Sequence, residues 1–454
     1  MSQASSTGLS SSNDSPDRGR AHVGELGVVW TLWFTYGAFY FCRTNLSAAV
    51  PGMGASLSEG GLGLSSQETG WILASLKVAY GVGQLLNGQL AERFSPRWLL
   101  AIGMFASAAL NVLFGFSTGF YFLLFVWAAN GYCQSLGWPP TVRVVGNWVP
   151  VHRRGKAIGI IGTGYQVTLG LTYLVAGQAA EHLGWRGALY VPAGLLALAG
   201  MFMLLCLRES PTDHADQASD ADPVAARYGI DGLRDGSTSP QRSSIEQRPW
   251  QENLLLTVSN PALWLLGLAL SFLNACRFGF VDWGVSHLMS VQDIGVGKAT
   301  LTYVVLAVGS AAGSFTAGWA SDRFFGSRRA PVMCILLVAL GMLTLLYEQV
   351  SQVSAYGTIG LLVVIGFCIM GPQVLLVGTA PADLARRGTA AAAAGFVNFL
   401  GYMGASAGDI VTGYYKSPAH GGWQVALYIW AGWAFAAALF AALLWNRTAR
   451  DSSQ

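Results

Sequence analysis

Charged residues are scarce in this chain. Asp, Glu, Lys and Arg make up 11% of its 454 residues, whereas 53% are hydrophobic and the mean hydropathy is +0.44. A soluble domain carries about 25% charged residues. The composition therefore excludes a water-soluble globule and indicates a polytopic helical membrane protein. The formal net charge of +3 is too small to indicate a nucleic-acid partner.

The signatures of several other function classes are also missing. There is no P-loop pattern, so ATP is not expected to drive the protein, and the six histidines do not cluster at metal-ligand spacing. No nucleophile lies beside a base in the sequence, so we expect neither an enzyme nor a cofactor. The cysteines form no CxxC pair and all lie in apolar runs, where reduced, packed thiols are expected: Cys42, Cys133, Cys206, Cys276, Cys334 and Cys368.

Long apolar runs are what the chain has in abundance. A helix needs about 20 apolar residues to cross a bilayer. By this measure the sequence predicts twelve spans, at about 26–52, 69–91, 97–116, 119–147, 157–180, 187–207, 258–288, 299–320, 330–347, 355–378, 388–413 and 422–445. The prediction is an all-α membrane protein with twelve transmembrane helices in two pseudo-symmetric six-helix bundles. Residues 1–20 are polar and Ser-rich without an apolar core, so we do not expect a signal peptide there.

The basic residues predict the orientation of these spans. Of the 26 Lys and Arg residues, four fall within spans (Arg43, Lys77, Arg143 and Arg277), three fall in loops on one side (Arg186, Lys298 and Lys416), and the rest fall on the side of both termini. Cytoplasmic loops carry the excess of Lys and Arg. Both termini are therefore expected in the cytoplasm.

A polar segment divides the chain into halves. Residues 209–252 are rich in Asp, Ser, Pro and Gln, and such a composition predicts a flexible cytoplasmic linker. The expected organisation is a disordered tail at 1–25, an N-terminal six-helix bundle at 26–208, the linker, a C-terminal six-helix bundle at 253–446 and a tail at 447–454.

The two halves share a repeated loop. After the second span the chain reads Gly88-Gln-Leu-Ala-Glu92-Arg93-Phe-Ser-Pro-Arg97, and after the eighth it reads Gly318-Trp-Ala-Ser-Asp322-Arg323-Phe-Phe-Gly-Ser-Arg328-Arg329. An internal repeat in a twelve-span protein is typical of a two-bundle transporter. The pattern resembles the signature loop of the major facilitator superfamily. The resemblance implies that its acid and arginines tie neighbouring helix ends together at the cytoplasmic face and steady one conformer, although such charges could also simply set the topology.

Further motifs resemble one family within that superfamily, the organophosphate:phosphate antiporters. They are Arg43-Thr-Asn-Leu-Ser-Ala-Ala-Val-Pro51, Asn130-Gly-Tyr-Cys-Gln134-Ser-Leu-Gly137-Trp138-Pro139-Pro140-Thr-Val-Arg143, Asp282-Trp283, Gly371-Pro372 and Gly395-Phe396 through Gly401-Tyr402. The family includes bacterial glycerol-3-phosphate and hexose-phosphate transporters and related eukaryotic sugar-phosphate exchangers. The resemblance covers nearly all twelve spans, and it implies an integral protein of a bacterial inner membrane, expected to be a monomer surrounded by membrane lipid.

Two arginines lie deep in apolar runs, Arg43 in the first span and Arg277 in the seventh. An arginine at the middle of a bilayer costs at least about 2.5–3.5 kcal/mol, so each must face a protein interior or a wet cavity. Their guanidinium groups match the charge and geometry of a phosphate monoester. The resemblance implies that both bind the substrate phosphate. The alternative is a structural ion pair with Asp282 or Asp409.

Three other charged positions lie within the spans. Lys77 is too deep in the second span for an interfacial anchor, so it either contacts the ligand or pairs with an acid. Arg143 follows the Trp-Pro-Pro run and either takes part in gating or extends to the membrane surface. Asp409, an intramembrane acid, is a functional candidate by default, and we group it and Asp282 with the conformational residues.

Polar and aromatic residues complete the predicted substrate site. Tyr165 and Gln166 lie where the glycerol-phosphate branch of the family has a histidine, so this chain departs from that branch. Asn274 lies one turn before Arg277 and could reach a sugar hydroxyl. Cavity positions are also expected for three further residues, namely Tyr40, Trp138 and Asn398.

The predicted function is secondary active exchange of an organophosphate (a sugar phosphate, glycerol phosphate or phosphoglycerate) for inorganic phosphate by alternating access. One alternative is a membrane sensor for sugar phosphate, because some members of the family signal to a histidine kinase. A transporter of another organic anion is a second alternative, since two arginines would also suit a carboxylate.

Overall fold

The computed structural model describes residues 16–209, 255–326, 328–384 and 390–445, and these parts of the chain contain helices and connecting turns but no strand. The expected linker 209–252 and the tail 447–454 lie almost wholly outside the described residues. Helix α1 begins at Pro16, so helix extends into the stretch 1–25 that the sequence suggests is a polar tail.

The helices of the first half follow the expected spans closely. They are α1 (Pro16–Ala38), η1 (Phe39–Cys42), α2 (Leu46–Gly54), η2 (Leu57–Glu59), α3 (Ser66–Arg93), α4 (Pro96–Phe116), α5 (Phe120–Ser135), α6 (Trp138–Trp148), α7 (Val151–Leu183) and α8 (Gly187–Cys206). Helix α3 begins with a capping box, in which Ser65 and Glu68 satisfy each other's backbone N–H groups.

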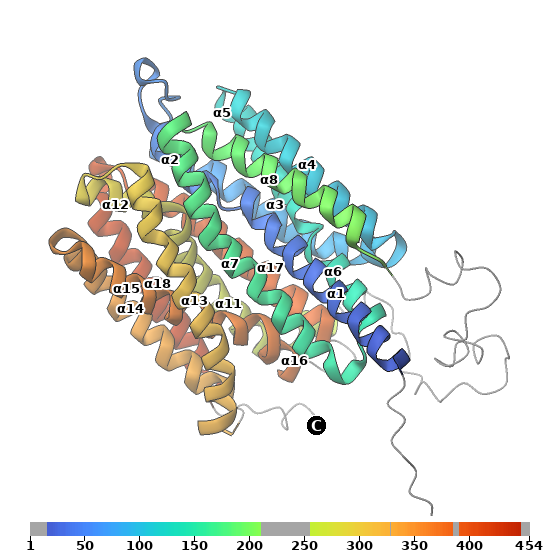
Figure 1. Cartoon of the computed structure of the whole chain (residues 1–454). Coiled ribbons are helices and arrows are strands. Elements are labelled where there is room, and N and C mark those ends of the chain that lie inside the picture. Colours follow the sequence, from blue (N-terminus) through green and yellow to red (C-terminus); the bar gives the residue numbers. More distant parts are fainter. Residues whose placement is uncertain (1–15, 210–254, 327, 385–389, 446–454) are drawn as a thin grey trace, which may run out of the picture.

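The second half repeats this arrangement. Its helices are α11 (Pro261–Phe278), the π-helical η5 (Gly279–Trp283), α12 (Gly284–Gln292), α13 (Val296–Phe324), α14 (Arg329–Val353), α15 (Ala355–Val374), the π-helical η6 (Leu375–Thr379), α16 (Ala380–Leu384), α17 (Ala390–Tyr415), η7 (Pro418–His420) and α18 (Gly422–Ala442). Figure 1 shows the two halves as adjacent groups of helices, the first in blue to green and the second in yellow to red.

Eight helical segments of the described chain are long and apolar enough to cross a membrane by length and composition alone. The other four expected spans have physical reasons for missing that standard. The first and fourth are divided, by the break after η1 and by the turn between α5 and α6. The second and eleventh, α3 and α17, contain polar, charged and glycine residues that lower their mean hydropathy, and their charged residues Lys77 and Asp409 pair with each other across the protein interior.

Glycines bring the two halves into backbone contact. A Cβ on Gly70 of α3 would overlap the carbonyl oxygen of Asp409 on α17, and one on Gly413 would overlap that of Ser66. A Cβ on Gly177 of α7 would overlap Thr300 of α13. Small residues at such crossings let helices approach closely where there is no hydrophobic driving force between them. The α3–α17 and α7–α13 pairs therefore form the junction between the halves.

Two ends of the bundle can be distinguished. We call the end at which α1 begins and α18 ends the near end. The far end carries the loop between α2 and α3 and the turn η7, which adjoin each other around a cavity lined by Ala55, Leu64, Lys416 and Trp423.

Candidate functional site

Arg43 lies where the first span is broken. The chain passes from η1 through a turn at residues 43–45 before α2 begins at Leu46. Such a break frees backbone carbonyls, which must find partners inside a membrane protein. The carbonyl oxygen of Cys42 accepts hydrogen bonds from the Asn130 side chain at 2.9 Å and the Asn111 side chain at 3.5 Å. The broken backbone is thus stabilised by polar side chains of α4 and α5.

The Asn130–Gln134 motif explains how Arg43 is held. These two residues are four apart on α5 and therefore share one helix face. Gln134 accepts a hydrogen bond from Arg43 Nε at 3.1 Å through its side chain, and one from Nη2 at 3.3 Å through its carbonyl oxygen. Ser107 of α4 links the two motif side chains, donating to Asn130 at 2.6 Å and accepting from Gln134 at 2.7 Å. A buried network therefore fixes the orientation of the guanidinium group.

Aromatic rings cover the faces of the Arg43 guanidinium group. Its Cζ lies 4.5 Å from the ring centroids of both Tyr40 and Tyr80. Tyr40 stacks on Tyr165 of α7 at 5.0 Å, and Tyr36 contacts Trp138 at 4.9 Å. The aromatic rings leave the edge of the planar guanidinium group uncovered, and its Nη1 atom is buried without a hydrogen-bond partner. Burying a hydrogen-bond donor without a partner costs free energy, so Nη1 is available to donate to an acceptor on a ligand.

Arg277 lies at the end of α11, immediately before the π-helical turn η5. It is 7% exposed and has no hydrogen bond or ion pair with any described residue, and its only aromatic contact there is Phe278 at 4.9 Å. None of its nitrogen atoms is among the fully enclosed polar atoms, so they face space that solvent reaches. The ring of Tyr402 on α17 lies 4.4 Å from the ring of Tyr80, which contacts Arg43, and 6.4 Å from the ring of Phe278, which contacts Arg277. The two arginines therefore border one cluster of aromatic rings.

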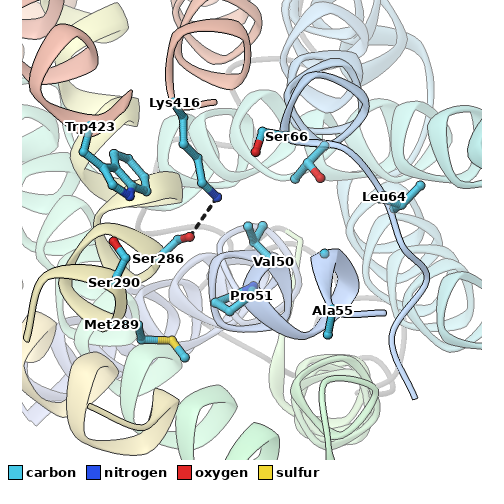
Figure 2. A pocket seen from close by; sticks show the side chains of 12 residues that line it. Val50, Pro51, Ala55, Leu64, Ser66, Ser286, Met289, Ser290, Lys416 and Trp423 are labelled. Carbon is cyan, nitrogen blue, oxygen red and sulfur yellow. Dashed lines mark hydrogen bonds between the residues drawn. The ribbon is translucent and has the colours of Figure 1, made fainter. Parts of the chain in front are cut away.

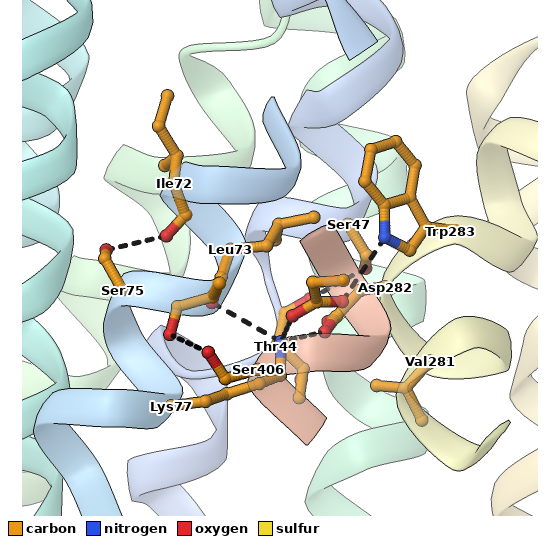
Figure 3. A network of polar contacts seen from close by, with 12 residues as sticks. Thr44, Ser47, Ile72, Leu73, Ser75, Lys77, Val281, Asp282, Trp283 and Ser406 are labelled. Atoms are coloured by element: carbon orange, nitrogen blue, oxygen red, sulfur yellow. Dashed lines mark hydrogen bonds and ion pairs between the residues drawn. The ribbon is translucent and has the colours of Figure 1, made fainter. Parts of the chain in front are cut away.

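The intramembrane acids do not pair with the arginines. Lys77 Nζ donates to Asp282 at 2.5 Å and also to Asp409, and all three side chains are at least 95% buried. Figure 3 shows this cluster, with Lys77 reaching from α3 toward Asp282 and Trp283, beside Ser406. The indole of Trp283 donates to Asp409 at 3.3 Å. The sequence leaves Lys77 between ligand contact and pairing with an acid, and the structure has the second arrangement.

The remaining predicted substrate residues are less closely associated with the arginines. The Gln166 side chain donates to Ser314 of α13 at 2.7 Å, across the junction of the halves, and its amide oxygen Oε1 is buried without a hydrogen-bond partner. The Asn274 amide packs against Gly401 of α17, with its oxygen likewise unpartnered. Asn398 lies half-buried on α17 without a hydrogen bond to another described residue.

The repeated loops lie at the near end. In the second half, Arg329 Nη1 contacts Asp322 at 2.7 Å, while Arg323 and Arg328 are exposed. In the first half, Arg97 donates to the carbonyl oxygen of Leu204 at the end of α8. Arg93 is exposed, and Glu92 is described only by its place in α3.

Arg143 is a cap on α3. It donates to the carbonyl oxygens of Ala91 and, at 2.8 Å, Phe94, at the end of that helix. A cation in this position satisfies carbonyls that have no partner within the helix and complements the helix dipole.

The sequence did not predict that Tyr36, Tyr80 and Tyr402 contribute to the site, nor that Gln134 orients Arg43. A signal existed for two of them. Tyr36 precedes Tyr40 by four residues and Tyr80 follows Lys77 by three, so each shares a helix face with a residue already singled out.

Comparisons with known proteins agree with this architecture. The family model of the Major Facilitator Superfamily matches residues 32–408. The chain is 31% identical over 387 residues to the membrane sensor protein UhpC of Salmonella typhimurium, covering 84% of this chain and 82% of that protein. It is 26% identical to a probable hexose phosphate transport protein of Chlamydia muridarum, with 92% and 90% covered, and 28% identical to the glycerol-3-phosphate transporter of Bacillus subtilis, with 93% and 92% covered.

Solved structures agree on the fold. The crystal structure of a bacterial homologue of the human lysosomal transporter Spinster, in an inward-facing and occupied conformation, matches with a TM-score of 0.70 at 17% identity, covering 95% of this chain and 97% of that one. Together with the helical bundle and its apolar spans, these matches identify an integral membrane protein. The chain belongs to the major facilitator superfamily and, within it, to the organophosphate:phosphate antiporter family.

Proposed function

We propose that this protein is a secondary transporter that exchanges an organophosphate for inorganic phosphate by alternating access, with Arg43 and Arg277 binding the phosphate group. One observation carries the proposal: both buried arginines lack an acidic partner among the described residues, whereas Asp282 and Asp409 are bound by Lys77. Two buried cations without anions require a ligand that supplies the charge. A phosphate monoester brings about −1.5 to −2 charges at pH 7.

The geometry supports different tasks for the two arginines. Gln134 holds Arg43 in a fixed orientation, with one N–H donor free, so Arg43 is preorganised for a phosphate oxygen. Arg277 has no such support and lies beside the π-helical turn, a feature that often marks functional sites. Arg277 is therefore the residue that adjusts to ligands of different size.

The Lys77–Asp282–Asp409 cluster supplies a closing contact toward the far end. It joins α3 of the first half to η5 and α17 of the second, so opening the far end requires separating Lys77 from both acids. When the site is empty, repulsion between the two guanidinium groups destabilises it, and a bound phosphate offsets this repulsion. If the protein changes between its two conformers readily only when a ligand is bound, the outcome is exchange rather than net transport.

The organisation around this site is part of the proposal. In this proposal the near end lies in the cytoplasm, because the distribution of Lys and Arg along the sequence predicts that orientation. Two bundles at 26–208 and 253–446, joined by the 209–252 linker, move against each other in a monomer surrounded by lipid. The organic part of the substrate is a sugar, a glycerol or a glycerate unit, as the names of the relatives suggest.

The experiment is phosphate:phosphate exchange in proteoliposomes. The variants Arg43→Lys and Arg277→Lys keep the positive charge but lose the planar guanidinium group that binds phosphate bidentately. The apparent affinity for phosphate should therefore fall about 10- to 100-fold in each. The matched control is Arg186→Lys, an arginine at the turn between α7 and α8 that donates to Gly115. Near-normal phosphate affinity in both test variants would overturn the proposal. Exchange of carboxylates in place of phosphates would instead favour another organic anion as substrate.

The resemblance to a membrane sensor favours a second candidate function, reception of sugar phosphate without bulk transport. The phosphate site would be the same in both cases. Turnover separates them: a transporter fills phosphate-loaded vesicles with labelled phosphate over many cycles, whereas a sensor binds phosphate and exchanges little.

A further inference from the structure

A cavity of about 460 Å³ opens at the far end, between the two halves. Its lining includes one cation, Lys416, and the hydroxyl groups of Ser66, Thr69, Ser286 and Ser290, and no acid. Thr69 and Ser290 donate to backbone carbonyl oxygens of their own helices, so Ser66 and Ser286 are the hydroxyl groups with a hydrogen left for a ligand. The volume falls within the roughly 300–1,000 Å³ of small-molecule sites. Figure 2 shows the Lys416 side chain extending toward Ser286, with Trp423 and Ser290 beside it. The chemistry of this lining suits a small anion.

Lys416 carries a charge that nothing in the described chain neutralises. Its Nζ donates to Ser286 at 2.9 Å and lies 4.9 and 5.1 Å from the ring centroids of Trp283 and Trp423, but it forms no ion pair with a described residue. An ammonium group has three donors, so two remain for a ligand. Burial also lowers the pKa of Lys416 to about 8, which reflects the cost of holding this charge away from water.

The cavity lies directly outside the Lys77 cluster. On each of the three chain segments that bear a member of the cluster, a lining residue lies further toward the far end. On α3, Thr69 precedes Lys77 by two helical turns, about 12 Å, and Lys416 follows Asp409 by about 10 Å. Ser286 comes one turn after Asp282. An anion in the cavity would therefore be separated from the central arginines by the ion cluster.

We propose that this far-end cavity is a second phosphate site, where Lys416 and the hydroxyl groups of Ser66 and Ser286 hold the phosphate group of a substrate before the Lys77 cluster opens. The inference rests on the proposed function, because it takes the phosphate group as the ligand. Proximity to Lys77 gives the site a consequence: a bound anion weakens the attraction between Lys77 and its two acids, so docking favours opening of the far end.

The test compares the two faces of the transporter. With proteoliposomes sorted by orientation, Lys416→Gln should raise the KM for phosphate supplied at the far end about 5- to 20-fold and leave the KM at the near end within about twofold. Lys416→Arg should restore the far-end KM, which shows that the protein is folded. Lys298→Gln, which removes an exposed far-end lysine that does not line the cavity, should change neither. Equal KM changes at both faces, or none, would overturn the proposal.

Equilibrium dialysis of the purified protein with labelled inorganic phosphate separates this site from the central one. Arg277→Gln should abolish exchange but keep a phosphate site that Lys416→Gln removes. If Arg277→Gln leaves exchange intact, the proposed function fails. If Lys416→Gln removes no bound phosphate in either background, the far-end site fails. Phosphatidylglycerol in nanodiscs provides the other source of a phosphate group: displacement of bound phosphate by this lipid, but not by neutral phosphatidylcholine, would overturn a site for free phosphate.

Discussion

Lys77 and Asp409 form an ion pair across the boundary between the two halves, with the lysine on α3 and the aspartate on α17. Both side chains are more than 95% buried. Removing one partner of such a pair leaves an uncompensated buried charge, which costs about 3–5 kcal/mol. The state in which this contact exists therefore depends on both residues together.

Lys77→Gln should shift the protein toward conformers open at the far end, because Asp282 and Asp409 then repel each other without a cation between them. The measurement is labelling, from the far end, of a cysteine placed at Ser406 with a membrane-impermeant maleimide; Ser406 is 5% exposed and lies about one turn before Asp409, on the inner side of the cluster. Labelling should accelerate by about tenfold or more. Asp293→Asn, an exposed acid at the far end, serves as the control. Unchanged labelling in Lys77→Gln would show that the ion cluster does not hold the far end closed.

Gln134→Glu should weaken phosphate binding more than Gln134→Leu does. The glutamate would give Arg43 a buried carboxylate that competes with phosphate, whereas leucine only removes a side-chain hydrogen bond. We expect losses of about 100-fold and about tenfold in phosphate affinity, measured by dialysis. Gln424→Glu changes an exposed amide near the far end that donates to Tyr428, and this variant should bind phosphate normally. The idea is wrong if leucine is the more harmful substitution.

Asp322→Asn should alter the balance of conformers and spare substrate affinity. The carboxylate contacts Arg329 at 2.7 Å and is 59% exposed, so this interaction is worth at most about 1 kcal/mol. Its place at the near end keeps it away from the arginines. Accessibility labelling at both ends should therefore change by up to about fivefold while the dissociation constant for phosphate stays the same. A collapse of affinity with constant labelling would contradict this assignment.

The far-end phosphate site should weaken as pH rises through 8. With a pKa of about 8, Lys416 is about nine-tenths charged at pH 7 and about one-tenth charged at pH 9. The far-end KM of the wild type, divided by that of Lys416→Arg, should therefore rise between these pH values, since arginine stays charged and the ratio cancels the ionisation of phosphate. A flat ratio would contradict the prediction.

Other titratable groups lie on the elements around Lys416, and both proteins in the comparison share them. They are Glu59, Glu68, Lys77, Asp282, His287, Asp293, Asp409 and His420. A pH dependence that belongs to any of these groups would appear equally in the wild type and in Lys416→Arg, and would cancel in the ratio.

Gly131→Ala should destabilise the protein by about 1–3 kcal/mol, because a Cβ at this position would overlap the carbonyl oxygen of Leu76 where α5 crosses α3. The matched control is Gly146→Ala on α6, where nothing lies within 4 Å of the added carbon. Thermal unfolding in the same detergent should show a lower midpoint for the first variant only. Equal midpoints would mean that the two helices can separate without cost.

The amino-acid sequence by itself was sufficient for the class of protein and for the expectation that Arg43 and Arg277 are buried in its interior. Span length follows from bilayer thickness, and a charge inside a long apolar run needs a functional or structural reason wherever the helices pack. The doubled loop pattern and the Asn130–Gln134 motif indicated the family before any contact was known. Helix starts, such as the one at Ser65 before α3, also have local causes.

Only the tertiary structure decided which charges are neutralised. Lys77 lies 205 residues from Asp282 and 332 from Asp409 along the chain, and no local pattern tells which intramembrane cation pairs with which acid. The same holds for Lys416, an ordinary loop lysine in sequence that packing places between two indoles beside a serine. Charge pairing inside a membrane depends on how helices from both halves meet. That arrangement is set by the close approach of helices at Gly70, Gly177 and Gly413 rather than by the composition of any one span.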